Sequence, residues 1–129
     1  MPTTTTTLVE RAIRSMSELR SDPGLFAADA VSWHNFDEVD VQTEPESYDA
    51  VRAIRTVVPD FDFHEIRTHD TGGGVSVAQY VILGTLPDGA TLRVPGVLIA
   101  HSCGGRITRL EEYVDTAQLA PVFALLGQT

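Results

Sequence analysis

The N-terminal half of the chain carries apolar residues at helical spacing. Apolar positions recur every three to four residues over 8–19, which predicts an amphipathic helix with one buried face. A second such pattern begins near Thr43, where Thr43 and Glu46 have the spacing of a capping box, and it ends before Pro59. Between these patterns, an aspartate–proline pair at the start of 22–26 predicts a short helix.

After Pro59 the apolar pattern changes from a helical period to a period of two, which predicts strands. Four strands are expected there, at residues 61–69, 74–86, 90–102 and 107–114, and the earlier run 31–36 predicts one more. Asp115 is expected to cap a final short helix that Pro121 interrupts. This order of elements predicts a single α+β domain over residues 1–129, with a disordered lead-in at 1–7.

The two longest predicted strands, 75–86 and 91–101, are apolar on both faces. In the first of them, Val77 and Val81 share one side of the strand, and Tyr80 shares the other side with Ile82. An antiparallel sheet with two apolar faces needs a cover on each. The helices can cover one face, and a second copy of the chain is the simplest cover for the other, so we expect a homodimer.

Composition and charge exclude several classes of partner. With 43% hydrophobic and 21% charged residues among 129, the chain has the composition of a globular protein large enough to bury a core. Its formal net charge of −9 disfavours binding to nucleic acid or to anionic membrane surfaces. No apolar run reaches membrane-spanning length, and the single cysteine, Cys103, favours a reducing cytoplasm. The four histidines lack the spacing of a zinc motif, so we expect no metal.

Three stretches carry a resemblance to a known superfamily: LFAADAVSWHN at 25–35, GTLPDGATLRVPGV at 84–97 and GRITRLEEYVDTAQLAP at 105–121. With the order of elements, they resemble the nuclear-transport-factor-2-like (NTF2-like) superfamily. This group includes the SnoaL-like polyketide cyclases, the ketosteroid isomerases and the limonene-epoxide hydrolases. The resemblance implies a cone-shaped α+β barrel, in which N-terminal helices pack on a strongly curved, mostly antiparallel sheet. A ligand would lie against the concave face, and the dimer would form through the convex face.

The resemblance to ketosteroid isomerases marks His34 as a pocket residue. Their catalytic aspartate ends the first strand, and an ungapped match of AADAVSWH places His34 there. A histidine suits proton transfer near neutral pH. The tyrosine that these isomerases carry on the first helix has no counterpart in 8–20, and 94–97 reads Val-Pro-Gly-Val where an acid is expected. The enolate-stabilising pair of that family is therefore missing, which argues against steroid isomerisation.

The resemblance to limonene-epoxide hydrolases adds Glu112. That family uses an arginine between two aspartates. Here Gln79 takes the place of the arginine, Val81 that of the first aspartate, and Glu112 that of the acid on the last strand. The tyrosine–asparagine pair of the family falls on Ser32 and His34, which marks His34 a second time.

The resemblance thus implies a SnoaL-like enzyme that holds a small apolar or polyketide-like molecule in a conical pocket. Without a cofactor, it would act as an isomerase, cyclase or dehydratase by general acid–base catalysis. His34 would be the base, Glu112 its partner or the proton donor, and Gln79 the residue that holds a carbonyl group. Other residues expected to line the pocket are Ser32, Trp33, Val81, Leu98 and Leu110. Two alternatives stay open: a non-catalytic ligand binder or dimerisation module, and a divergent epoxide hydrolase.

Overall fold

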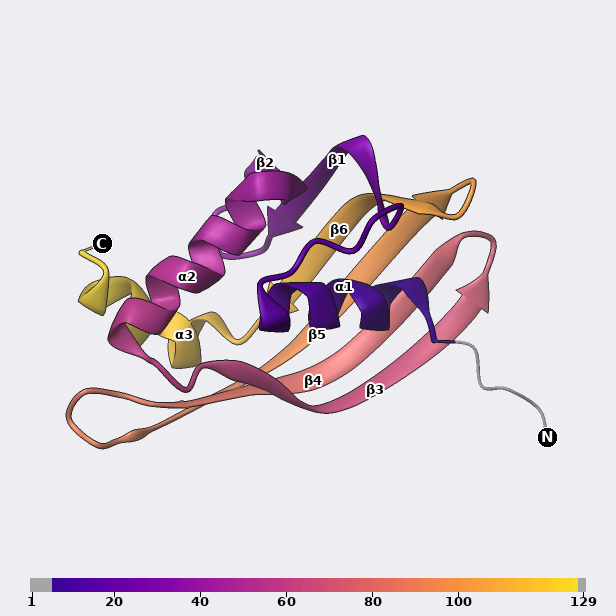
Figure 1. Ribbon diagram of the computed structural model, residues 1–129. Helices are drawn as coiled ribbons and strands as arrows, with labels where there is room; N and C mark the ends of the chain where they lie inside the picture. The colour runs from indigo at the N-terminus through magenta and orange to yellow at the C-terminus, as the bar shows by residue number, and fades with distance from the viewer. Residues whose placement is uncertain (1–5, 128–129) are drawn as a thin grey trace.

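The computed structural model describes residues 6–127, which form a six-stranded sheet and three helices (Figure 1). The strands are β1 (Phe26–His34), β2 (Asp40–Gln42), β3 (Asp62–Gly72), β4 (Val75–Thr85), β5 (Thr91–Cys103) and β6 (Arg106–Val114). The helices are α1 (Leu8–Glu18), α2 (Tyr48–Val57) and α3 (Thr116–Leu125). No helix among these residues is long and apolar enough to cross a membrane.

The sheet has the order β2-β1-β6-β5-β4-β3. The strand β1 pairs in parallel with β6, and the other neighbouring strands pair antiparallel. Figure 1 shows α1 and α2 across one face of the curled sheet, with α3 next to α2 at one end. The predicted α+β class with a mostly antiparallel sheet is confirmed.

The helix α1 forms as its apolar period predicts. Four side chains on one of its faces are at most 9% exposed: Val9, Ala12, Ile13 and Met16. Burial of each of the three larger ones contributes roughly 1.5–3 kcal/mol. Thr7 caps the helix, because its hydroxyl accepts a hydrogen bond from the backbone N–H of Glu10 at 3.2 Å. Five of the seven residues of the expected lead-in, 1–5, lie outside the described part of the chain.

The short helix predicted at 22–26 is absent, and a turn takes its place. The backbone N–H of Leu25 donates to the carbonyl of Asp22 at 3.1 Å, and Gly24 has a φ of +81° that favours glycine. The Asp22 carboxylate does not cap a helix, because it accepts two hydrogen bonds from Arg11 at 2.8 and 3.0 Å. The Asp22 carboxylate, which the local pattern assigned to capping, is thus bonded to a side chain from another part of the chain.

The helix α2 begins five residues later than predicted, after an irregular turn. The Glu46 carboxylate accepts a hydrogen bond from the backbone of Gln42 at 2.7 Å, and not from Thr43. The Thr43 hydroxyl turns inward and lies 2.9 Å from the Ser32 hydroxyl. The predicted capping box is therefore wrong, whereas the end of the helix before Pro59 is confirmed.

Asp115 caps α3 as predicted, by accepting a hydrogen bond from the backbone N–H of Gln118 at 3.1 Å. The predicted interruption at Pro121 is wrong, because α3 continues through it. Leu119 and Val122, 5% and 0% exposed, anchor the helix on both sides of the proline. This packing offsets the backbone hydrogen bond that a proline inside a helix removes.

The face of β4 that packs against the helices is not the face that the expected pocket requires. Three of its alternate side chains are at most 3% exposed beneath the helices: Ala78, Tyr80 and Ile82. Gln79 is exposed and Val81 half-buried on the outer face, so their expected places in the pocket are wrong. A period of two fixes which residues share a face. Because both faces of this strand are apolar, the pattern could not fix which face the helices cover.

Candidate functional site

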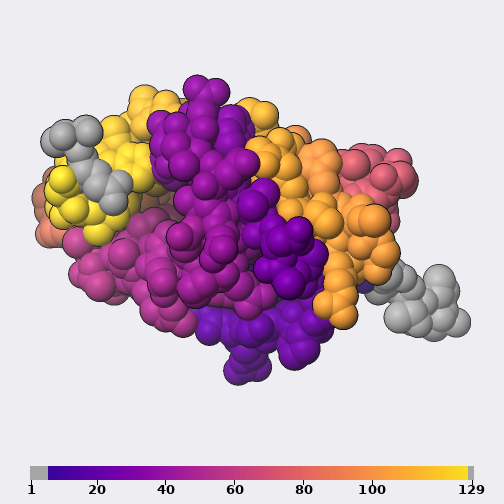
Figure 2. Space-filling model, turned by 90° about the horizontal axis from the view of Figure 1, so that it is seen from above, coloured from indigo at the N-terminus to yellow at the C-terminus, as the bar shows by residue number. Residues whose placement is uncertain are grey.

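A cavity of about 120 Å³ lies between the inner face of the sheet and the helices. Most of its lining is apolar and includes Met16, Phe63, Leu98, Leu110, Leu119 and Phe123. Seen from above, α3 (yellow) lies beside the purple and magenta segment that runs from β2 into α2 (Figure 2). An apolar cavity of this size is comparable to one that holds a single aromatic ring.

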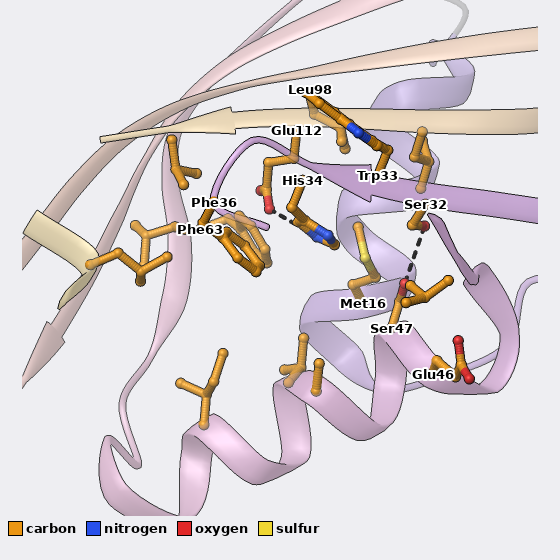
Figure 3. Close-up of a pocket in the computed structure, with 18 of the residues that line it drawn as sticks. Met16, Ser32, Trp33, His34, Phe36, Glu46, Ser47, Phe63, Leu98 and Glu112 are labelled. Atoms are coloured by element: carbon orange, nitrogen blue, oxygen red, sulfur yellow. Dashed lines mark hydrogen bonds and ion pairs between the residues drawn. The ribbon is translucent and has the colours of Figure 1, made fainter. Parts of the chain in front are cut away.

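His34 and Glu112 meet in the wall of this cavity (Figure 3). Parallel pairing sets His34 of β1 opposite Glu112 of β6, which places both side chains on the inner face. His34 Nε2 lies 3.4 Å from Glu112 Oε1, and the two side chains are 25% and 15% exposed. A hydrogen of the imidazole can therefore point at the carboxylate while the ring borders the cavity.

Asn35 holds the two strands in this register. Its backbone N–H donates to the carbonyl of Glu112 at 3.0 Å. Its side-chain amide donates to the carbonyl of Val114 at 3.1 Å and accepts from the N–H of Val114 at 3.0 Å. A shift of β1 along β6 would break all three bonds and separate His34 from Glu112. The sequence pattern gave Asn35 no such role, since Val114, the partner of its side chain, lies 79 positions away.

Tyr80 is a second partner of Glu112 that the sequence analysis missed. Its hydroxyl donates a hydrogen bond to Glu112 Oε2, and its ring packs edge-on against Phe63 with centroids 5.2 Å apart. Burial, and then the negative charge of Glu112, raises the pKa of Tyr80 well above its usual value. The hydroxyl therefore stays protonated and acts as a donor to the carboxylate.

Gly96 makes room for Tyr80. It lies opposite Tyr80 on β5, and a Cβ atom at this position would come within 2.9 Å of the tyrosine ring. Only glycine lets the ring lie across the neighbouring strand at that distance. The sequence signal that could have identified Tyr80 is Gly96, a glycine that lies opposite an aromatic residue. It can be recognised only when the register of β4 and β5 is known.

Phe36 forms an aromatic wall beside the histidine. Its ring stacks on His34 with centroids 4.8 Å apart, and it contacts Phe123 of α3 at 4.9 Å. Phe36 is 37% exposed, so it lies where the cavity approaches solvent. An apolar ring at this position limits the access of water to the imidazole and strengthens electrostatic interactions around it.

The structure brings together most of the residues that the sequence analysis selected. Those that line the cavity are Ser32, His34, Leu98, Leu110 and Glu112. Trp33 borders the cavity, but its indole packs against Tyr113 on the outer face, with centroids 5.2 Å apart. Gln79 and Val81 lie outside the cavity, so Gln79 cannot hold a carbonyl group there.

The cavity differs from the charged site of epoxide hydrolases and from a metal centre. No arginine is found among the described residues that line it. Over residues 6–127, no three His, Cys, Asp or Glu side chains gather in a way that could hold a metal ion. The chemistry that these residues offer is proton transfer between an imidazole and a carboxylate.

No protein-family model and no curated protein matches the sequence, but many solved structures match the fold. A candidate polyketide cyclase from Xanthomonas campestris pv. campestris has a TM-score of 0.71 at 19% identity, covering 89% of this chain and 93% of its own. A candidate polyketide cyclase from Streptomyces antibioticus has a TM-score of 0.71 at 15% identity, covering 91% and 96%. A protein with a ketosteroid isomerase-like fold from Catenulispora acidiphila, in complex with trimethylamine, has a TM-score of 0.70 at 16% identity, covering 98% and 96%.

The chain has the nuclear-transport-factor-2-like fold. The fold expected from the three sequence stretches is therefore confirmed. At identities of 15–19% these likenesses establish the fold and leave the reaction open, because one fold supports many functions. Within this nuclear-transport-factor-2-like sheet, the inner face carries His34, Glu112 and Tyr80.

Proposed function

We propose that this protein is a cofactor-free acid–base enzyme of the SnoaL-like type, an isomerase, cyclase or dehydratase for a small apolar carbonyl compound. The proposal rests on the His34–Glu112 pair, 3.4 Å apart in the wall of a mostly apolar cavity. Electrostatic interactions are stronger in such surroundings than in water. The structural neighbours support the proposal, since they include candidate polyketide cyclases and a candidate isomerase from Bacillus subtilis.

In this mechanism His34 is the base. With Nε2–H turned toward Glu112, the lone pair is on Nδ1, and this atom takes a proton from a carbon next to the substrate carbonyl. Glu112 then faces an imidazolium and stabilises its charge, as the carboxylate of a catalytic triad does. Return of the proton to another carbon gives an isomer, and its transfer to a leaving hydroxyl group releases water.

Tyr80 acts through Glu112 and is a positioning residue. Its hydroxyl occupies Oε2 of the carboxylate, which leaves Oε1 toward His34. Glu112 is thereby held in the orientation that the imidazole needs.

The experiment that tests the proposal is hydrogen–deuterium exchange on small carbonyl probes. Cyclohex-2-enone and pentane-2,4-dione are incubated with the protein in D₂O, and the loss of their proton signals is followed by NMR. His34→Gln is expected to slow the protein-dependent exchange by about 10²–10⁴-fold. His64→Gln, which changes an exposed histidine of β3, is the matched control and leaves the rate unchanged. Exchange that is not accelerated by the wild type, or that survives His34→Gln, refutes the proposal.

The second candidate is a non-catalytic binder of small hydrophobic ligands. The size of the cavity favours this candidate. The large apolar side chains that line it leave a volume of about 120 Å³, which suits a small hydrophobic ligand. A passive binder would take up toluene and cyclohex-2-enone with affinities that do not depend on His34, and would exchange no protons. Ligand titration of His34→Gln beside the exchange assay separates the two candidates.

We also propose a homodimer in which a second copy covers the outer face of the sheet. Paired strands place apolar side chains next to one another on this face: Val77, Val81, Val97, Ile99 and Tyr113. Tyr113 is 45% exposed and belongs to this group, and contiguous exposed apolar patches are typical of protein–protein contact sites. Light scattering should give a dimer for the wild type and a monomer for Val97→Arg. A monomeric wild type would contradict the proposal.

We further propose a cytoplasmic location. The support is Cys103, a free and exposed thiol that suits a reducing compartment. Fractionation of cells that express the full chain tests it, and recovery outside the cytoplasm would contradict it.

A further inference from the structure

Three buried hydroxyl groups gather at one end of the cavity. Ser32 Oγ lies 2.9 Å from Thr43 Oγ1 and 3.2 Å from Ser47 Oγ. The three residues are 3%, 1% and 7% exposed. Ser32 and Ser47 line the same cavity as His34, and Figure 3 shows them on the opposite side of Met16 from the phenylalanine rings. They are the hydroxyl groups of an otherwise mostly apolar wall.

These hydroxyls carry more protons than their mutual hydrogen bonds use. Ser47 donates to Ser32, and one further bond joins Ser32 to Thr43, so two bonds use two of the three protons. If Thr43 donates to Ser32, the Ser32 proton is free in the cavity wall. If Ser32 donates instead, the Thr43 proton is free. A buried donor without an acceptor is unfavourable, so an acceptor brought into the cavity by a ligand favours the first arrangement.

The position of Ser32 relative to His34 suits a carbonyl compound. The two residues are two positions apart on β1 and share its inner face, with Cα atoms about 6.6 Å apart. An oxygen held at Ser32 therefore leaves the carbons a few bonds away facing the imidazole. The carboxylate of Glu46, beside Ser47, accepts from the backbone of Gln42 at 2.7 Å and points away from the cluster in Figure 3.

We propose that Ser32, supported by Ser47 and Thr43, binds the carbonyl oxygen of the substrate, which makes small ketones and enones the substrate class of this cavity. The inference rests on the proposed function, because it supplies the partner for the charge that His34 generates. When His34 takes a proton, the C–H bond breaks and its electron pair moves onto the carbonyl oxygen. The resulting enolate oxygen accepts the hydrogen bond of Ser32. Return of the proton to another carbon restores the carbonyl group and the neutral imidazole.

The energetic reason is that a fixed donor stabilises charge at the atom where it develops. Hydroxyl groups already oriented in a cavity with little water need no reorganisation when the enolate forms. The hydroxyl cluster thus takes the place of the tyrosine and acid that ketosteroid isomerases use and that this sequence lacks. It also supplies the carbonyl contact that Gln79 cannot make.

The test uses two probes of the same shape. Cyclohex-2-enone has a carbonyl oxygen, and 3-methylidenecyclohexene has a CH₂ group in its place. NMR titration gives the two dissociation constants, and infrared spectroscopy of the bound enone reports hydrogen bonding as a lower carbonyl frequency. Ser32→Ala should weaken enone binding about fivefold, abolish the frequency shift and leave the hydrocarbon affinity unchanged. Ser47→Ala, a change one step further from the oxygen, should reduce the shift in part.

The control is Ser76→Ala, which removes another buried serine, 7% exposed and outside the cavity, and should alter the binding of neither probe. The subsite is overturned if the carbonyl frequency of the enone does not shift on binding to the wild type. It is also overturned if Ser32→Ala and Ser47→Ala both leave the wild-type shift unchanged. A wild type that does not bind the enone overturns it as well.

Deuterium exchange distinguishes a failure of the subsite from a failure of the proposed function. Ser32→Ala should slow the exchange of cyclohex-2-enone about a hundredfold if both are right. If the wild type shifts the carbonyl frequency without exchanging protons, the subsite stands and the acid–base function fails. If the wild type exchanges protons without a frequency shift, the function stands and the subsite is overturned.

Discussion

Replacing Tyr80 with phenylalanine tests the geometry of the proposed proton-transfer site by removing a single oxygen atom. The ring can keep its contact with Phe63, and Glu112 keeps His34 at 3.4 Å but loses the donor to Oε2. A hydrogen bond to a charged group contributes roughly 1.5–3 kcal/mol. We therefore expect the free energy of unfolding at pH 7 to fall by about 2 kcal/mol.

For a chain of this length, that loss lowers the melting temperature by roughly 6–10 °C. Urea unfolding followed by circular dichroism gives the free energy, and calorimetry gives the melting temperature. The control is Tyr113→Phe, which makes the same chemical change on a ring that is 45% exposed. Its effect should stay within about 0.5 kcal/mol.

The same variant should alter the exchange reaction. The carboxylate of Glu112 loses the donor that fixes its orientation toward His34, so the exchange rate at saturating probe should fall while the dissociation constant of the probe stays unchanged. A fall in rate without a change in affinity separates positioning from packing, which would change stability alone. If Tyr80→Phe matches Tyr113→Phe in both unfolding and exchange, Tyr80 does not hold Glu112 and the inferred role is refuted.

Three further substitutions test other parts of the structure. Gly96→Ala places a Cβ within 2.9 Å of the Tyr80 ring, so it should cost about 1–3 kcal/mol in urea unfolding. It should add little to Tyr80→Ala, which removes the ring, and full additivity of these two changes would contradict the contact. The hydrogen bond from His101 chiefly lowers the pKa of Glu111, and a carboxyl group with a lower pKa in the folded state contributes stability that is lost as pH falls through that value. Between about pH 5 and pH 3, the wild type should therefore lose stability more steeply than Glu111→Gln, as urea titrations at several pH values would show; equal slopes would contradict the pairing. Leu98→Ala, at a cavity-lining position that is 2% exposed, should lower the free energy of unfolding by about 2–4 kcal/mol. The enlarged cavity should bind bicyclic ligands in NMR titrations. If the largest ligand that binds is the same as for the wild type, the cavity collapses and this prediction is contradicted.

The sequence predicted elements correctly where one face of a segment is apolar and failed where a local signal had a distant partner. The apolar stripe of α1 and the period of two after Pro59 correspond to the observed elements. The two failed capping predictions have one cause. Arg11 takes the carboxylate of Asp22, and Ser32 takes the hydroxyl of Thr43. Capping potential is visible in the sequence, but the tertiary partner that competes for the same group is not.

The resemblance supplied His34 and Glu112 as candidate residues, and alternation along the strands then determines which neighbours share their face. His34, Glu112 and Leu110 line the cavity together because parallel pairing of β1 with β6 puts them on one face. The placement of Gln79 failed because β4 is apolar on both sides, so its pattern could not tell the inner face from the outer. Tyr80 then faces inward, and only the strand register reveals that it reaches a carboxylate on another strand.

The polar groups around the cavity fall into two sets that differ in how fully they are bonded. Asn35 uses both ends of its amide, and Glu112 uses one oxygen for Tyr80 and the other for His34, so these groups hold the site together. Ser32 shares in a cluster with one proton more than its bonds require, and His34 has a second ring nitrogen beyond the one that faces the carboxylate. Every buried side-chain nitrogen and oxygen among residues 6–127 has at least one hydrogen-bond partner, so each of these two groups offers a ligand one further bond. A substrate that accepts one hydrogen bond and gives up one proton would complete both, and this is the chemistry of an enolisable carbonyl compound.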